Sequence, residues 1–215
     1  MPVHADDSGF DAVVFDWGGV ITVDPDPVAR RSFEAAGVDL VELRKCRAKI
    51  TGDPDELPFA RLERGEISVD DYLSLMRQNM PGSEVLWDRE SPHFMFSKLT
   101  VRNEVIDLIH GLRARGFVTA LLTNNVAEMW PLLLETTPVD DLFDVSVNSA
   151  FVGMRKPEHR IFHHTLDLMG VPAERAVFLD DMAPNIDAAR ALGMATVRVR
   201  RPGQAIGSLE RLLAG

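Results

Sequence analysis

The sequence predicts an α/β protein in which a parallel sheet carries helices on both of its faces. Short apolar segments without polar alternation, such as 12–15 and 176–179, are typical of strands that are buried on both sides. From residue 101 onward these segments alternate with helical patterns, and such alternation favours right-handed crossovers between parallel strands. A chain of 215 residues is long enough for one such core with a modest insertion.

The first strand is expected at Ala12–Phe15, and it ends at the carboxylate of Asp16. The segment 23–27 that follows contains two prolines, each preceded by aspartate, which disfavours a helix and predicts a hinge or crossover. From there to about residue 97 only helical patterns occur. We therefore expect an all-helical insertion at 25–97 in a core formed by 1–24 and 98–215. Its helices are expected at Val28–Ala36, Leu40–Ile50, Pro58–Arg64, Val69–Met80 and Ser83–Asp88.

The second part of the chain repeats strand and helix in turn. Val101–Arg115 has an apolar face and ends before Gly116, a residue that commonly closes helices. The next helix, Val126–Glu135, contains Pro131, which is expected to kink it. The other strands are expected at Phe117–Thr123, Phe143–Val147, Ala176–Leu179 and Ala195–Val199, and the other helices at Glu158–Met169, Pro184–Leu192 and Ala205–Leu213.

The composition limits the kinds of molecule that this protein is expected to bind and the compartment in which it is expected. The formal net charge of −10 argues against nucleic acid, which binds to basic faces. We find no apolar run long enough to span a membrane and no signal-peptide pattern, so no membrane association is expected. Cys46 is the single cysteine, which excludes an intrachain disulfide and favours a cytoplasmic location.

Polar residues follow the predicted strands at their carboxyl ends, and these ends meet at one edge of a parallel sheet. A carboxylate nucleophile, a hydroxyl and amide donor, a lysine and a carboxylate pair are the groups needed for phosphoryl transfer to aspartate. Asp16 with Asp180 or Asp181 would hold Mg²⁺, which binds through few carboxylates together with phosphate and water. Lys156 and Mg²⁺ would make the site locally positive in an acidic protein. The residues concerned are Asp16, Thr123, Asn124, Asn125, Lys156, Asp180 and Asp181.

These elements, in this order, resemble the motifs of the haloacid dehalogenase superfamily. The resemblance runs from about Phe10 to Val199 and is closest to the group that contains the phosphatase domain of soluble epoxide hydrolase and bacterial sugar-1-phosphate phosphatases. The four matching stretches are Asp16-Trp17-Gly18-Gly19-Val20, Leu121-Leu122-Thr123, Lys156-Pro157 and Asp180-Asp181.

The resemblance implies a Rossmann-like doubly wound sheet of strand order 5-4-1-2-3, with a helical cap where the insertion lies. It implies that Asp16 attacks phosphorus, that Thr123 and the Asn124 amide hold phosphate oxygens, and that Lys156 offsets negative charge. The metal ligands would be Asp16, the Gly18 carbonyl and Asp181. Asp180 would orient Lys156 or a bound water, and Asn185 would bind to the groups that contact the phosphate and the metal. The expected activity is a Mg²⁺-dependent phosphatase of small phosphorylated metabolites that acts through an aspartyl-phosphate, as a monomer or homodimer.

One position departs from the superfamily pattern. Gly18 stands where these phosphatases usually carry a second aspartate, which protonates the leaving oxygen, and such an acid contributes about 10²- to 10⁴-fold in rate. Substrates with good leaving groups, such as sugar 1-phosphates, acyl phosphates or diphosphates, need this acid less. Alternatively Asp24 or Asp26 replaces it, or the protein binds phosphate without turnover, or it performs non-hydrolytic chemistry on diphosphates. Dehalogenation fits poorly, because it would leave the Asp180-Asp181 pair without a purpose.

Overall fold

The computed structural model describes residues 9–23, 41, 57–79 and 100–214. The helices expected at 28–36 and 83–88, and all of the one at 40–50 except Val41, lie outside these residues, as do Asp24, Asp26 and Cys46. Between residues 57 and 79 the chain forms two of the predicted helices, α3 (Pro58–Glu63) and α4 (Val69–Asn79), and no strand.

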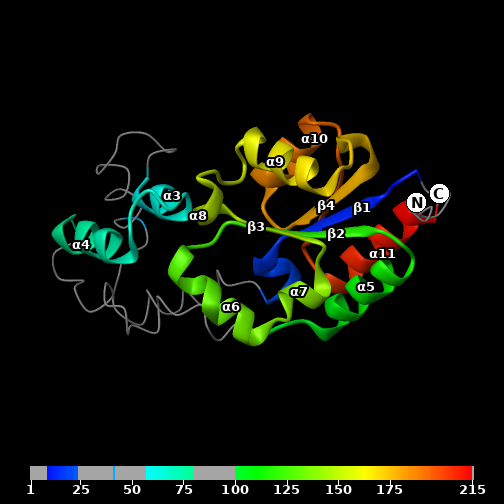
Figure 1. The fold of residues 1–215 in the computed structure, drawn as a ribbon, viewed down its shortest axis with the longest axis horizontal. Helices are drawn as coiled ribbons and strands as arrows, with labels where there is room; N and C mark the ends of the chain where they lie inside the picture. Colours follow the sequence, from blue (N-terminus) through cyan, green and yellow to red (C-terminus); the bar gives the residue numbers. More distant parts are fainter. Residues whose placement is uncertain (1–8, 24–40, 42–56, 80–99, 215) are drawn as a thin grey trace.

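The sheet has five strands, all of them parallel, in the order β3-β2-β1-β4-β5 (Figure 1). This is the predicted order, and every predicted strand is present to within a residue or two. The strands are β1 (Ala12–Phe15), β2 (Val118–Thr123), β3 (Val145–Asn148), β4 (Ala176–Asp180) and β5 (Ala195–Arg198).

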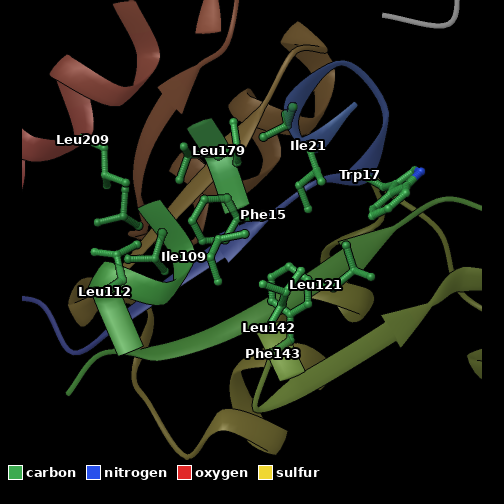
Figure 2. Packing of buried hydrophobic residues seen from close by; sticks show 14 of the residues in the cluster. Phe15, Trp17, Ile21, Ile109, Leu112, Leu121, Leu142, Phe143, Leu179 and Leu209 are labelled. Carbon is green, nitrogen blue, oxygen red and sulfur yellow. The ribbon is translucent and has the colours of Figure 1, made fainter. Parts of the chain in front are cut away.

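Helices cover both faces of the sheet, which explains why β1 is apolar at every position. Val13 and Phe15 of β1 face one cluster, whereas Ala12 and Val14 face the other, because successive side chains of a strand point to opposite faces. Figure 2 shows the first cluster around Phe15. Its helices are α5 (Asn103–Ala114), α6 (Trp130–Thr136), α7 (Val139–Leu142) and α11 (Pro202–Leu213), and those of the opposite face are α9 (His159–Met169) and α10 (Ala183–Ala191).

The kink expected at Pro131 is wrong. Pro131 lies in the first turn of α6, directly after a single 3₁₀ turn at Ala127–Met129 (η5). The first turn of a helix tolerates proline because its N–H groups have no helical acceptor. For the same reason the last helix begins at Pro202, three residues before the expected start at Ala205.

Three short segments have no counterpart among the predicted elements: α7, the four-residue helix α8 (Ser149–Val152) and the 3₁₀ turn η6 (Ala173–Arg175). Each is too short for a hydrophobic period of 3.6 residues to show. Within the described residues, no helix has the length and apolar character needed to cross a membrane.

The chain leaves and re-enters the core at adjacent points. Thr22 pairs antiparallel with Val101, and the N–H of Val23 donates to the carbonyl of Thr100 at 3.0 Å. Residues 22–23, which follow β1, therefore lie beside residues 100–101, which precede α5.

Candidate active site

Asp16 stands at the carboxyl end of β1, where the sheet ends and an irregular turn, Trp17–Ile21 (η1), begins. Its own N–H donates to the carbonyl of Leu179 in β4 at 2.9 Å, which fixes the backbone at the sheet edge. Its Oδ1 accepts the N–H of Trp17 at 2.7 Å and the ammonium of Lys156 at 2.7 Å. These two bonds occupy one carboxylate oxygen and leave Oδ2 for other chemistry.

Lys156 reaches this carboxylate from the loop between α8 and α9, and its side chain is 1% exposed. Its Nζ lies 2.7 Å from Asp16 Oδ1, 2.8 Å from Asp180 Oδ2 and 2.8 Å from the carbonyl oxygen of Leu122. Three acceptors for three N–H bonds satisfy the buried ammonium completely. The lysine therefore joins the ends of β1, β2 and β4.

Asp180 is fully buried, and both of its oxygens accept hydrogen bonds. Oδ2 accepts from Lys156 and from the Asn185 side chain at 3.0 Å, and Oδ1 accepts from the N–H of Met182 at 2.7 Å. Asn185, in the first turn of α10, also donates to Oδ1 at 3.1 Å. Both oxygens of this carboxylate are therefore engaged in hydrogen bonds to the lysine and to the start of the loop and helix that follow β4.

Asp181 is the more exposed member of the pair, and its carboxylate lies directly over Gly19. Gly19 has φ +75°, and a Cβ at this position would overlap Asp181 Oδ2. Only glycine allows both this left-handed conformation and so close an approach. The turn after Asp16 is thereby held against the end of β4.

Asp16, Asp180 and Asp181 each place one carboxylate oxygen within 4.8 Å of the others, the largest such acidic group in the described part of the chain. The single ammonium of Lys156 contacts two of these carboxylates, Asp16 and Asp180, and a divalent cation would add positive charge to this acidic group. Carboxylate oxygens are the ligands that Mg²⁺ prefers. The donor set and the charge therefore fit the predicted metal.

The pKa shifts of Asp16 and Lys156 also fit a cation bound at this cluster. Burial raises the pKa of the Asp16 carboxyl to about 7; Asp180 and Asp181 add to this effect, whereas Lys156 opposes it. Burial acts to lower the pKa of Lys156, but Asp16 and Asp180 outweigh it and hold the pKa above its usual value. A cation beside Asp16 would favour the ionised carboxylate, the form that a nucleophile needs.

The segment after β2 contributes differently at each residue. Thr123 is the last residue of β2 and is buried, at 3% exposed. The Asn124 side chain binds the backbone of Lys156 on both sides: its Oδ1 accepts the lysine N–H at 2.8 Å and its Nδ2 donates to the lysine carbonyl at 2.9 Å. Its backbone N–H is then the group left for a phosphate oxygen. Asn125 bonds to Ser149 through its backbone.

The sequence reasoning missed Arg102, which stands where the chain re-enters the core before α5. Its Nη1 donates to the carbonyl of Gly19 at 2.7 Å and to that of Val20 at 3.1 Å, and it also contacts the carbonyl of Thr22. It therefore gathers the carbonyls of the turn that follows Asp16. No local pattern marks this arginine, because its three partners lie about 80 residues earlier in the chain.

The structure brings Asp16, Lys156 and the Asp180-Asp181 pair together at one sheet edge, with Asn185 bound to Asp180, whereas Asp24 and Asp26 lie outside the described residues. A family model for haloacid dehalogenase-like hydrolases matches residues 10–193. The chain belongs to the haloacid dehalogenase-like hydrolase family. The expected membership of the haloacid dehalogenase superfamily is thereby confirmed.

Curated relatives and solved structures agree with the family. The chain is 33% identical to acyl-CoA dehydrogenase family member 10 of Mus musculus over 98% of its length, and 30% identical to sesquiterpene phosphatase astK of Aspergillus oryzae over 86% of its length and 87% of that protein. It spans only 20% of the mouse protein and 31% of bifunctional epoxide hydrolase 2 of Rattus norvegicus, to which it is 28% identical over 73% of its length. A family enzyme of Bacteroides thetaiotaomicron, crystallised with magnesium and inorganic phosphate, superposes with a TM-score of 0.65 at 22% identity, covering 88% of this chain and 93% of that one.

Proposed function

We propose that this protein is a Mg²⁺-dependent phosphatase of small phosphorylated metabolites and that Asp16 is its nucleophile. The observation that carries the proposal is the position of Lys156, whose ammonium lies 2.7 Å from Asp16 and 2.8 Å from Asp180 at one sheet edge. A phosphatase among the relatives and a related enzyme crystallised with magnesium and phosphate support the same reading.

In this proposal Asp16 Oδ2 attacks phosphorus, and the bond between phosphorus and the leaving oxygen breaks. Lys156 stays bound to Oδ1 and offsets the charge of the incoming phosphate, while the Thr123 hydroxyl and the Asn124 backbone N–H donate to its oxygens. Water then attacks the aspartyl-phosphate, which releases phosphate, returns Asp16 to its carboxylate and gives a proton to solvent. Asp16, the Gly18 carbonyl and Asp181 would hold Mg²⁺, which supplies further neutralisation of the transferring phosphoryl group.

The substrate class that we propose follows from Gly18, which stands where related phosphatases usually carry an aspartate. No side chain at this position protonates the leaving oxygen, so leaving groups that are stable as anions are favoured. Sugar 1-phosphates and diphosphates have such groups. We propose that the insertion at 25–97 acts as the cap that selects among them; the cytoplasmic location and the monomeric or dimeric state stay predictions.

Release of inorganic phosphate from a panel of sugar 1-phosphates, acyl phosphates, diphosphates and plain phosphomonoesters tests the proposal. We expect Mg²⁺-dependent release, its loss in Asp16→Asn and its retention in Asp187→Asn, since Asp187 is exposed and pairs with Arg190 on α10. If no substrate of the panel releases phosphate with Mg²⁺, the assignment is wrong.

Gly18 favours a second candidate, a phosphate-binding protein without turnover. The two are distinguished by beryllium fluoride, which mimics the phosphorylated aspartate. Binding of beryllium fluoride by the wild type, lost in Asp16→Asn and without hydrolysis of any panel member, would favour this second candidate.

A further inference from the structure

The end of α3 lies directly against the segment that leads to Lys156. Gly65, just after α3, has φ +67°, and a Cβ on it would overlap the carbonyl oxygen of Ala150 in α8. The inserted unit and the core therefore touch backbone to backbone, with no space for a side chain. The loop 153–158 begins where α8 ends, so this contact sits at its base.

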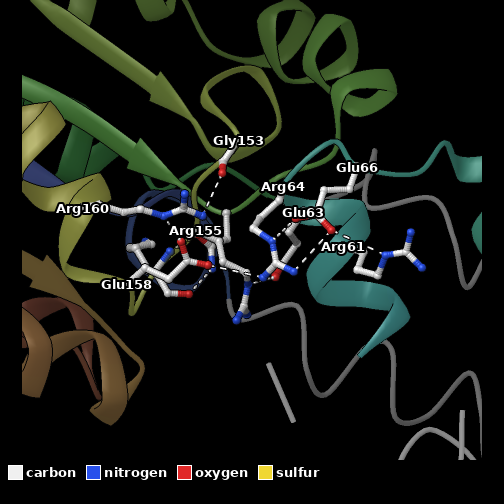
Figure 3. Close-up of polar contacts among 10 residues, drawn as sticks. Arg61, Glu63, Arg64, Glu66, Gly153, Arg155, Glu158 and Arg160 are labelled. Carbon is white, nitrogen blue, oxygen red and sulfur yellow. Dashed lines mark hydrogen bonds and ion pairs between the residues drawn. The ribbon is translucent and has the colours of Figure 1, made fainter. Parts of the chain in front are cut away.

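Two ion pairs cross the same boundary and flank Lys156 in the sequence. Arg155 Nε lies 2.7 Å from Glu63 Oε2, and Arg64 Nη1 lies 3.3 Å from Glu158 Oε1 (Figure 3). Both partners on the core side belong to the loop 153–158, one immediately before the lysine and one two residues after it. The loop is thus bound to α3 at two points.

The Glu63–Arg155 pair is the more buried of the two: the exposed fractions of the side chains are 10% and 21%. Burial raises the pKa of Glu63, and the charges of Arg155 and Lys156 oppose this effect, so the electrostatic influence of the lysine extends to α3. Removing one partner from a buried pair leaves an uncompensated charge, which costs far more than the loss of an exposed pair.

Another pair of the same chemistry is more exposed and lies entirely within the core. Arg115 and Glu210 are 3.2 Å apart, and their side chains are 33% and 48% exposed. Such pairs contribute little to stability. This pair is therefore an internal control for the buried one. Glu66 does not serve as a control, because it also binds Arg64, which pairs with Glu158 across the boundary.

We propose that Glu63 and Arg155 are positioning residues for Lys156, which hold the loop 153–158 in place when α3 is seated on the core. Their pair connects the inserted unit to the ammonium that contacts Asp16 and Asp180. The placement of the loop that carries the lysine therefore depends on the seating of α3 against it. The expected loss of activity rests on the proposed function, whereas the positioning of the loop 153–158 rests on the contacts alone.

The test compares Glu63→Gln with Glu210→Gln, the same change at an exposed acid of α11 that pairs with Arg115. We expect Glu63→Gln to raise amide hydrogen exchange in 153–158 by about tenfold and to lower kcat for phosphate release by about tenfold or more, with KM changed less than twofold, because a misplaced catalytic group lowers the rate of the chemical step. Glu210→Gln should match the wild type in all three. Arg155→Gln should reproduce Glu63→Gln, and Glu63→Asp serves if the first variant does not fold.

Equal exchange of 153–158 in Glu63→Gln and Glu210→Gln would overturn the proposal. So would a fall in melting temperature with faster exchange throughout the chain and an unchanged kcat, since the pair would then be structural only. If the wild type releases no phosphate from the panel, the proposed function fails, and the exchange comparison by itself decides whether the pair positions the loop.

Discussion

Replacing Lys156 by methionine tests the charge balance of the site, because methionine keeps an unbranched apolar side chain that is one atom shorter and removes the ammonium. In the wild type this group meets two carboxylates and one carbonyl at 2.7 to 2.8 Å. The variant leaves Asp16, Asp180 and Asp181 together with no lysine. Removal of one member of a buried ion pair costs about 3–5 kcal/mol, and for a chain of this size each kcal/mol lowers the melting temperature by about 2–4 °C. We therefore expect a decrease of roughly 6–20 °C at pH 8.

The expected loss depends on pH in a defined direction. The raised pKa of Lys156 means that its stabilising contribution is fully present below its ordinary value of 10.5, so the ammonium itself does not titrate between pH 5 and 8. The pKa of the Asp16 carboxyl is about 7 in the wild type, and Lys156 acts to lower it. Without the lysine this pKa should rise further. Protonation of Asp16 then relieves the repulsion as the pH falls, and the stability difference between variant and wild type should shrink towards pH 5.

Thermal unfolding of both proteins with a chelator at pH 5, 6, 7 and 8 measures this difference, and addition of Mg²⁺ should restore part of it at pH 8. Arg160→Met is the matched control, since Arg160 forms an exposed pair with Glu158, and its melting temperature should stay within about 2 °C of the wild type. A Lys156→Met variant as stable as the wild type at pH 8 would show that the cluster is not charge-balanced by this lysine.

Three further predictions concern single positions. Gly18 has φ −67° and ψ 130°, a conformation that an aspartate also adopts. Gly18→Asp should therefore raise the rate of hydrolysis of plain phosphomonoesters by about 10-fold or more in steady-state kinetics. An unchanged rate would mean that a missing acid does not limit this enzyme. Gly19→Ala should abolish Mg²⁺-dependent activity and weaken Mg²⁺ binding in calorimetry, because its Cβ overlaps the carboxylate of Asp181; wild-type affinity would contradict this. Asn124→Ala removes two hydrogen bonds to the backbone of Lys156, and it should lower stability by about 1–3 kcal/mol in urea denaturation and reduce kcat; a full kcat would show that the lysine needs no such support.

Local pattern predicted the sheet well, because buried parallel strands are continuous apolar runs and helices between them repeat every 3.6 residues. It did not predict α7 or α8, which are too short to show a period, nor that Pro131 would begin a helix instead of kinking one. The acidic pair at the end of β4 is evident in the sequence, but the different contacts of its two members could not be derived from the residues. Asp180 is saturated by Lys156, Met182 and Asn185, and only the packing of side chains shows this.

The sequence by itself indicated which polar groups stand at the ends of buried strands, since strand positions and side-chain chemistry follow from local runs of residues. The order of the strands was implied only by the family resemblance. Tertiary structure alone decided which of these groups touch. Arg102 holds a turn 83 residues before it, and Arg155 meets Glu63 across 92 residues. Contacts over such separations depend on how whole helices and strands pack, and no local periodicity records that packing.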